Sequence, residues 1–170
     1  ALLHYNEDAA DIHQPLLIWW AIEAQMSRTD AATLVHQLLA SPEMWKQRLV
    51  AGTITERLMK RYALAGTRQD LLNAAGLLNA APDRESTELL LKGFEEAFQG
   101  RSLAGIPDEL IQALGRSGGG SLALRFRQAQ PDAIAEVVGI LGDTQAASAQ
   151  RLSLIEIAGQ LHLPQLFAPL

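Results

Sequence analysis

Apolar residues follow the spacing of α-helices along nearly the whole chain, and this constrains the fold more than any other feature of the sequence. Leucine and alanine dominate, whereas β-branched residues are sparse and never alternate with polar residues over the length of a strand. Apolar residues three and four positions apart form the stripe that an amphipathic helix buries. The sequence therefore predicts an all-α fold.

Proline, glycine and capping residues set the bounds of the expected helices. The first is expected from Asp8 to Met26, with a kink or a restart at Pro15. A long helix is expected from Pro42 to Ala65, with a bend at Gly52 and Thr53. The other helices are expected over 30–40, 68–80, 84–99, 122–128, 131–141 and 146–160, with a short one from Pro107 and another from Pro164.

A weak repeat runs through this pattern. The segment Leu38–Pro42 recurs as Leu77–Pro82 and then as Ile140–Asp143. The first interval is about 40 residues, the length of a two-helix HEAT or armadillo unit. Irregular helical repeats of this kind stack into a curved solenoid. We therefore expect an irregular HEAT/armadillo-like solenoid that forms one domain over residues 1–170. The chain begins without methionine and stops within an apolar pattern, so we expect this domain to be a fragment excised from a larger multidomain chain.

The composition excludes several classes of function. The formal net charge is −5, which disfavours nucleic-acid binding because phosphates need a basic face. The chain has no cysteine, so it has no disulfide, thiolate metal site, iron–sulfur cluster or covalently attached haem. Its longest apolar run, Leu16–Ile22, is far shorter than the ~20 residues of a membrane span. We expect neither a nucleic-acid partner nor membrane insertion by this segment.

Two of the three tryptophans are adjacent in the segment QPLLIWWAIEA, which begins at Gln14. Apolar residues occupy all faces of this helix, a pattern typical of a helix buried between two layers. We expect Trp19 and Trp20 to pack in the core and Glu23 to form an ion pair with Arg57 or Arg61. A ligand groove floored by tryptophan and an interface with a partner are the alternatives.

No motif predicts a catalytic, cofactor-binding or metal-binding residue in this segment, and no cofactor is expected. None of the four histidines pairs with another at the spacing of a helical metal site, and no nucleophile elbow is present. The glycine-rich stretch Gly115–Ser121 is interpreted as a flexible loop, and an anion or partner contact at Gly118-Gly119-Gly120 is the alternative.

Basic residues form two local clusters, Arg57, Lys60, Arg61 and Arg68 in one and Arg125 and Arg127 in the other. In an acidic domain such residues usually lie on solvated faces or form intramolecular ion pairs. The alternative is a docking face for an acidic partner or a neighbouring domain.

Two segments resemble known families. The stretch His13–Glu23 resembles the P-L-L-x-W-W-A-x-E segment of large membrane-bound dehydrogenases of the Planctomycetes–Verrucomicrobia group, and 58–62 and 77–82 look like the segments that follow it there. The stretch Arg151–Leu161 resembles the second helix of a HEAT repeat, whose arginine usually braces an aspartate in the preceding turn. Asp143, eight residues earlier, is the aspartate available to Arg151.

The resemblance implies that this segment is the helical middle of a longer protein. Such proteins look like a sorbosone-dehydrogenase-type propeller, a HEAT-like middle and a cytochrome c domain. A parent chain of this kind is expected to be a PQQ- or haem-dependent sugar dehydrogenase in the periplasm or at a membrane. The segment itself is expected to be a non-catalytic scaffold that positions neighbouring domains or binds a protein partner.

The alternative function is a groove that binds a peptide or a small molecule. The residues proposed for it are Trp45, Tyr62 and the face carrying Arg57 and Arg61. An enzyme in its own right has little support, because no residue pattern supplies a nucleophile, an acid–base pair or a metal site.

Overall fold

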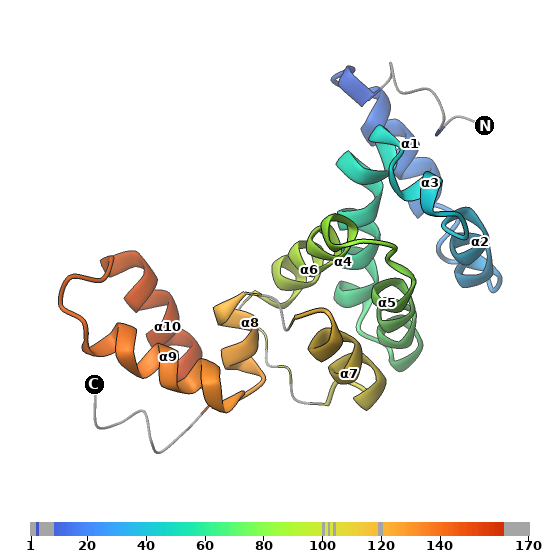
Figure 1. The fold of residues 1–170 in the computed structure, drawn as a ribbon. Coiled ribbons are helices and arrows are strands. Elements are labelled where there is room, and N and C mark those ends of the chain that lie inside the picture. Colours follow the sequence, from blue (N-terminus) through green and yellow to red (C-terminus); the bar gives the residue numbers. More distant parts are fainter. Residues whose placement is uncertain are drawn as a thin grey trace. The chain divides into compact units, whose positions relative to one another are not determined.

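The computed structural model describes residues 3, 9–99, 101, 103, 105–118 and 121–161 of the chain (Figure 1). The named elements among these residues are ten α-helices and one π-helical segment, and none is a strand. The predicted all-α class is therefore confirmed. The final helix expected from Pro164 lies outside the described residues.

The chain divides into two compact units, and each is described by itself. Unit 1 comprises Ala1–Ala97 and Ile106–Ser117, and unit 2 comprises Phe98–Gly105 and Gly118–Leu170. The prediction that residues 1–170 form one solenoid domain stays a prediction.

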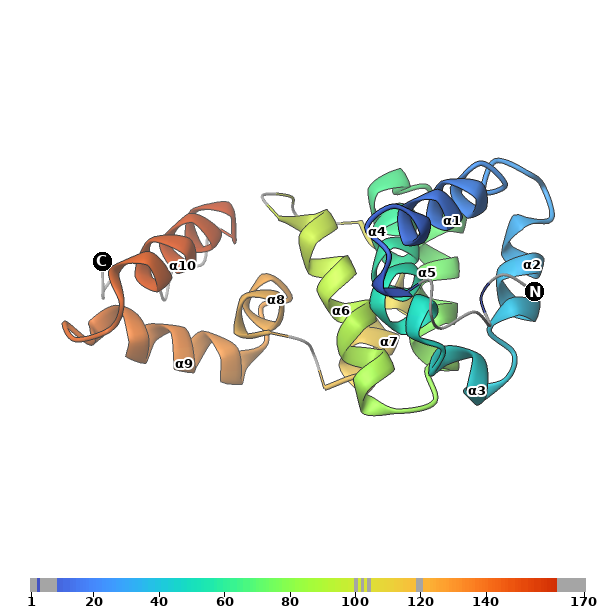
Figure 2. The ribbon, with the colours of Figure 1, turned by 90° about the horizontal axis from the view of Figure 1, so that it is seen from above.

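The helices of unit 1 pack around a shared hydrophobic core. Helix α4 (Thr55–Ala65) continues directly from the π-helical segment η3 (Val50–Ile54) and lies against α5 (Arg68–Ala80), and α5 lies against α7 (Asp108–Arg116) (Figure 2). The largest fully buried side chains of this unit include Trp45, Ile54 and Phe94. The elements are α1 (Gln14–Glu23), α2 (Ala31–Leu38), α3 (Pro42–Trp45), η3 (Val50–Ile54), α4 (Thr55–Ala65), α5 (Arg68–Ala80), α6 (Arg84–Phe98), whose last residue falls in unit 2, and α7 (Asp108–Arg116).

Helix α1 is shorter than the sequence predicted. The carboxylate of Asp11 accepts hydrogen bonds from the backbone N–H groups of His13 (2.7 Å) and Gln14 (2.8 Å), and the helix begins at Gln14. Pro15 occupies the first turn, where its missing N–H costs nothing. Of the two alternatives at Pro15, a kink and a restart, the structure shows a helix start. The helix ends at Glu23, before the predicted Met26.

Asp30 stands at the start of α2 but does not cap it through its side chain. Its carboxylate instead pairs with the guanidinium of Arg28, with an N–O distance of 2.9 Å. The predicted capping role of Asp30 is therefore wrong, because a nearby cation competes for the same carboxylate oxygens.

The long helix predicted from Pro42 to Ala65 is not continuous. Helix α3 ends at Trp45, and the backbone then takes a π-helical turn over Val50–Ile54 before α4 begins at Thr55. The Thr55 hydroxyl donates to the carbonyl oxygen of Val50 at 2.9 Å, which satisfies an acceptor in the wider turn. The bend predicted at Gly52 and Thr53 therefore takes the form of this π-helical turn.

Helices α4 and α5 meet at a tight junction with recognisable caps. Gly66 adopts a left-handed conformation (φ 66°) that ends α4, and glycine reaches this conformation without strain. The hydroxyl oxygen of Thr67 then accepts from the backbone N–H of Asp70 at 3.1 Å and begins α5. The same hydroxyl donates to the Asp70 carboxylate. These local bonds explain why the predicted bounds 68–80 are confirmed.

We expect Thr67→Ala to lower the free energy of unfolding of unit 1 by about 1 kcal/mol, because the N-cap bond is lost. Thr67→Ser retains a hydroxyl and serves as the matched control. Urea unfolding followed by tryptophan fluorescence measures the change. Equal stability of the alanine variant and the wild type would contradict the capping role.

Helix α6 begins behind a capping aspartate, as predicted. The Asp83 carboxylate accepts from the backbone N–H of Ser86 at 2.9 Å. Hydrogen bonds from the backbone and then the side chain of Ser86 hold the pKa of Asp83 below its ordinary value of 3.8. Because ionisation is favoured in the folded state, this contribution to stability is present above pH 3.8 and is lost as the pH falls through the folded pKa.

We expect Asp83→Asn to make unit 1 less sensitive to acid. The amide oxygen of asparagine still caps the helix, but it does not titrate in this range. Thermal unfolding at neutral pH and below pH 3.8 measures the difference. The wild type should lose more stability than the variant on acidification, and equal losses in the two proteins would contradict the prediction.

Helices α4 and α6 approach each other with their backbones in close contact. A Cβ atom added at Gly93 would lie 2.2 Å from the backbone oxygen of Glu56. Two ion pairs flank this contact, Lys60 to Glu96 at 2.9 Å and Lys92 to Glu56 at 2.7 Å. Glycine at position 93 therefore sets the distance between the two helices.

Unit 2 contains α8 (Leu122–Arg127), α9 (Pro131–Gly142) and α10 (Ser148–Leu161), which pack pairwise against one another (Figure 2). Arg125 on α8 pairs with Asp132 at 2.6 Å and with Glu136 at 3.0 Å, and so connects α8 to α9. The buried residues that form the hydrophobic core of this unit are Phe126, Ala133, Val137, Leu141, Leu154, Ile157 and Ala158.

Candidate functional site

The two adjacent tryptophans of α1 have different surroundings. Trp19 is buried, with 5% of its surface exposed, whereas Trp20 is 59% exposed and Leu17 is 55% exposed. The prediction that both tryptophans are buried is correct for Trp19 and wrong for Trp20. Adjacent helical residues point about 100° apart, and the rest of unit 1 covers one side of α1 only. Leu17 and Trp20 lie three residues apart on the other side, and we call these two residues the α1 face.

Glu23 pairs with Arg61, one of its two predicted partners, at an N–O distance of 3.7 Å. The two side chains are 42% and 35% exposed, so the ion pair lies near the surface and contributes little stability. Arg57, the other predicted partner, is exposed on α4. The ion pair that was expected inside the core therefore lies at its edge.

Most of the first basic cluster forms ion pairs within the chain. Besides Arg61, Lys60 pairs with Glu96, and Arg68 pairs with Glu109 at 3.4 Å. Arg125 of the second cluster pairs with two carboxylates of α9. These contacts favour the intramolecular interpretation of the clusters over a docking face for an acidic partner.

Arg151 bonds to a different acceptor from the turn aspartate that the HEAT pattern suggested. Its guanidinium donates to the carbonyl oxygen of Leu141 at 3.1 Å, near the end of α9. The carboxylate of Asp143 accepts from the backbone N–H of Gln145 at 2.8 Å. Arg151 therefore connects α10 to α9 through a backbone acceptor.

The loop expected over Gly115–Ser121 begins only after Arg116, because α7 continues through Gly115 to Arg116. Gly118 has φ +81°, a conformation that favours glycine. Ser121 ends the stretch, and its hydroxyl oxygen accepts from the backbone N–H of Leu124 at 3.3 Å to begin α8. Gly119 and Gly120 lie outside the described residues, so the expected anion contact stays untested.

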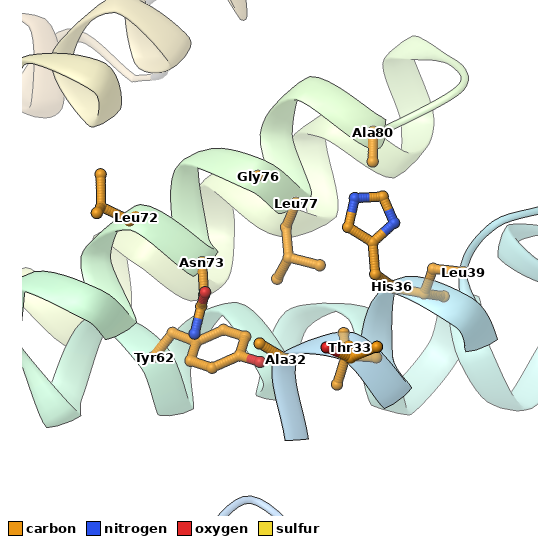
Figure 3. A pocket seen from close by; sticks show the side chains of 11 residues that line it. Ala32, Thr33, His36, Leu39, Tyr62, Leu72, Asn73, Gly76, Leu77 and Ala80 are labelled. Atoms are coloured by element: carbon orange, nitrogen blue, oxygen red, sulfur yellow. The ribbon is translucent and has the colours of Figure 1, made fainter. Parts of the chain in front are cut away.

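A groove of about 340 Å³ lies between α2, α4 and α5 of unit 1. Figure 3 shows side chains of α2 and α5 facing each other across it, with Tyr62 of α4 in between. Its volume is at the lower end of the range for small-molecule pockets, about 300–1,000 Å³. Eleven residues line the groove: Ala32, Thr33, Val35, His36, Leu39, Tyr62, Leu72, Asn73, Gly76, Leu77 and Ala80.

The groove is mostly apolar, and the polar residues of its lining are Thr33, His36, Tyr62 and Asn73. Only 3% of the surface of Tyr62 is exposed, and its buried hydroxyl has no hydrogen-bond partner among the described residues. Burial, with a smaller effect of the negative charge of Asp70, raises the pKa of Tyr62 from its ordinary value of 10 to about 12. Asn73 extends toward the Tyr62 ring, and His36 extends from α2 toward Ala80 (Figure 3).

This groove only partly matches the one predicted from the sequence. Tyr62 lines it, but Trp45, Arg57 and Arg61 do not. Trp45 is 2% exposed, and its indole N–H donates to the carbonyl oxygen of Leu39 at 2.9 Å. The residues that sequence reasoning missed, His36, Asn73 and Gly76, come from two helices far apart in the chain. Of these three residues, Gly76 was the one that the sequence could have indicated. A glycine inside a helix that neither caps the helix nor forms a turn usually has a packing or functional reason.

A second, smaller hollow of about 230 Å³ lies beside α2, on the side of α1. Its lining includes Ile22, Met26, Leu34 and Leu38 and is almost entirely apolar. Gln25 is its one polar side chain.

Three further observations concern the part of the chain that the structure describes. No group of three or more histidine, aspartate or glutamate side chains there comes together as metal ligands, and His4 and His162 lie outside it. None of the described helices combines the length and apolarity of a membrane span. No family model, curated protein or solved structure matches this chain.

Proposed function

We propose that this chain is a non-catalytic helical interaction domain, which holds a neighbouring domain of a longer dehydrogenase protein through the α1 face. The exposure of Trp20 carries the proposal. Large exposed aromatic side chains are uncommon on surfaces without partners and dominate binding energy where interfaces form. Trp19 anchors the same helix in unit 1, so that the helix presents Trp20 and Leu17 from a supported backbone.

The proposed partner is a folded domain rather than an acidic peptide. Leu17 and Trp20 are apolar, and the basic residues Lys60, Arg61 and Arg68 are already paired with acids. The Trp-Trp segment also resembles the helical middle of multidomain dehydrogenases, in which neighbouring domains of the same chain are available as partners. A HEAT/armadillo-like solenoid is the fold we propose for this role, because stacked helices keep a fixed spacing that a flexible linker does not.

The native gene around this segment provides the first test. The proposal expects a propeller-type dehydrogenase domain upstream and a Cys-x-x-Cys-His haem domain downstream. Each neighbour is then produced separately and titrated with residues 1–170 by calorimetry. Binding should weaken about tenfold or more in Trp20→Ala, as expected for a hot-spot residue.

Leu152→Ala serves as the control, since Leu152 is exposed on α10 of unit 2. This variant should bind like the wild type. A gene without such neighbours, an absence of binding, or equal binding by wild type and Trp20→Ala would each contradict the proposal.

A further inference from the structure

The π-helical segment η3 carries an inference that does not depend on the α1 face. We infer that η3 is a conformational device that corrects the register of a helical segment, because it takes up one residue, Gly52, that the packing of this segment does not need. Three observations support this inference: the spacing of the buried residues, the surroundings of Gly52, and the neighbours of η3 and α4.

The buried residues of η3 and α4 come in adjacent pairs that are unevenly spaced. Each residue of these pairs is at most 3% exposed. The pairs are Leu49-Val50, Ile54-Thr55, Leu58-Met59 and Tyr62-Ala63. The last three pairs follow one another at intervals of four positions, whereas the first two are five positions apart. The first interval therefore contains one residue more than the others.

An α-helix does not place pairs that are five positions apart on one face. Successive residues are about 100° apart, so an interval of four leaves about 40° between two pairs, and an interval of five leaves about 140°. In η3 the backbone N–H of Thr55 instead bonds to the carbonyl oxygen of Val50, five positions earlier. The Thr55 hydroxyl donates to the same oxygen at 2.9 Å. The wider turn thus returns both pairs to the buried face.

Gly52 is the residue of this turn that the buried face does not use. It is exposed, and a Cβ added there meets nothing within 4 Å. Its neighbours Ala51 and Thr53 are partly buried. Removal of Gly52 would therefore take away no side chain, and it would shorten the interval between the first two buried pairs from five positions to four.

The extra residue lies where the segment changes its neighbours. The turn η3 packs against α1 and α3, whereas α4 packs against α5. With the same residues in a regular α-helix, Leu49 and Val50 would turn about 100° away from their present direction relative to α4. The π-helical turn therefore preserves both sets of contacts in a segment that is one residue too long for a single α-helix.

Deletion of Gly52 from the full chain tests the inference. We expect the variant to form a continuous α-helix through the former turn, with all four pairs still buried. Its urea midpoint, followed by tryptophan fluorescence, should equal that of the wild type or lie above it. Backbone chemical shifts from NMR should be α-helical where the wild type has the π-helical turn.

Deletion of Arg61 is the matched control. It also removes one residue from the segment, but between Met59 and Tyr62. Loss of the π-helical turn would then place Arg57 on the buried face instead of Met59, so this variant should unfold at a clearly lower urea concentration. Arg61→Ala should unfold near the wild type, and it accounts for the lost ion pair with Glu23.

Three results would overturn the inference. A midpoint clearly below the wild type after deletion of Gly52 would mean that the core needs all five positions. A folded deletion variant that retains a π-helical turn would mean that Gly52 is not the extra residue. Wild-type stability after deletion of Arg61 would mean that the spacing of the pairs does not set the register. None of these results bears on the Trp20 binding experiment, so the two proposals fail separately.

Discussion

Gly93→Ala should destabilise unit 1 by about 3 kcal/mol or more. The added methyl group would lie 2.2 Å from the backbone oxygen of Glu56, so α4 and α6 must move apart. Overpacking that shifts side chains and backbone typically costs about 1–3 kcal/mol, and occasionally more. Here the obstacle is backbone, and the gain of about 1 kcal/mol in helix propensity offsets only part of the cost.

The same shift would disturb the contacts beside Gly93. Lys92 pairs with Glu56 and Lys60 pairs with Glu96 across the same two helices. All three tryptophans lie in unit 1, so the unfolding of this unit can be followed by tryptophan fluorescence during urea titration. The midpoint for Gly93→Ala should fall to a much lower urea concentration.

Gly115→Ala is the matched control for this prediction. Gly115 also lies in a helix of unit 1, but a Cβ added there meets nothing within 4 Å. Its alanine variant should be as stable as the wild type or slightly more stable. If Gly93→Ala unfolds at the same urea concentration as Gly115→Ala, the close approach of α4 and α6 is wrong.

Trp19→Ala should cost about 3–5 kcal/mol of the free energy of unfolding, whereas Trp20→Ala should change it by less than about 1 kcal/mol. Trp19 is 5% exposed, so its truncation leaves a cavity that the surrounding helices fill only in part. Trp20 is 59% exposed, and most of its side chain already contacts solvent. The two variants remove the same side chain from neighbouring positions, so each is the control for the other.

Urea unfolding of the two variants, followed by circular dichroism, measures this difference. Equal destabilisation by both substitutions would support a helix that is buried all round and would contradict the exposure of Trp20. Equal stability of both would mean that α1 does not pack through Trp19. Either result would also remove the basis for the α1 face as a docking surface.

Local interactions explain where sequence reasoning succeeded. The bounds of α5 were predictable because Gly66 and Thr67 end one helix and begin the next through bonds to residues within four positions. Asp83 caps α6 in the same way. Asp30 shows the limit of such reasoning, because its carboxylate had a competing cation two residues away.

Long-range packing explains where it did not succeed. Whether α1 is covered on one side or on all sides depends on which helices lie beside it, and adjacent tryptophans carry no information on this. The acceptor of Arg151 is a backbone carbonyl, which any residue at position 141 would supply. No sequence pattern could therefore identify it.

The sequence by itself determined the all-α class, most helix bounds and the absence of cysteine chemistry, because these depend on composition, on spacing and on bonds between near neighbours. Only the tertiary structure decided that Trp20 is exposed, that Trp45 is in the core and that Tyr62 lines a groove beside α2 and α5. The physical reason is that burial is a property of contacts between residues distant in the chain. Gly93 illustrates both kinds of information. The sequence predicts the helix that contains it, whereas its contact with Glu56 is visible only in the folded structure.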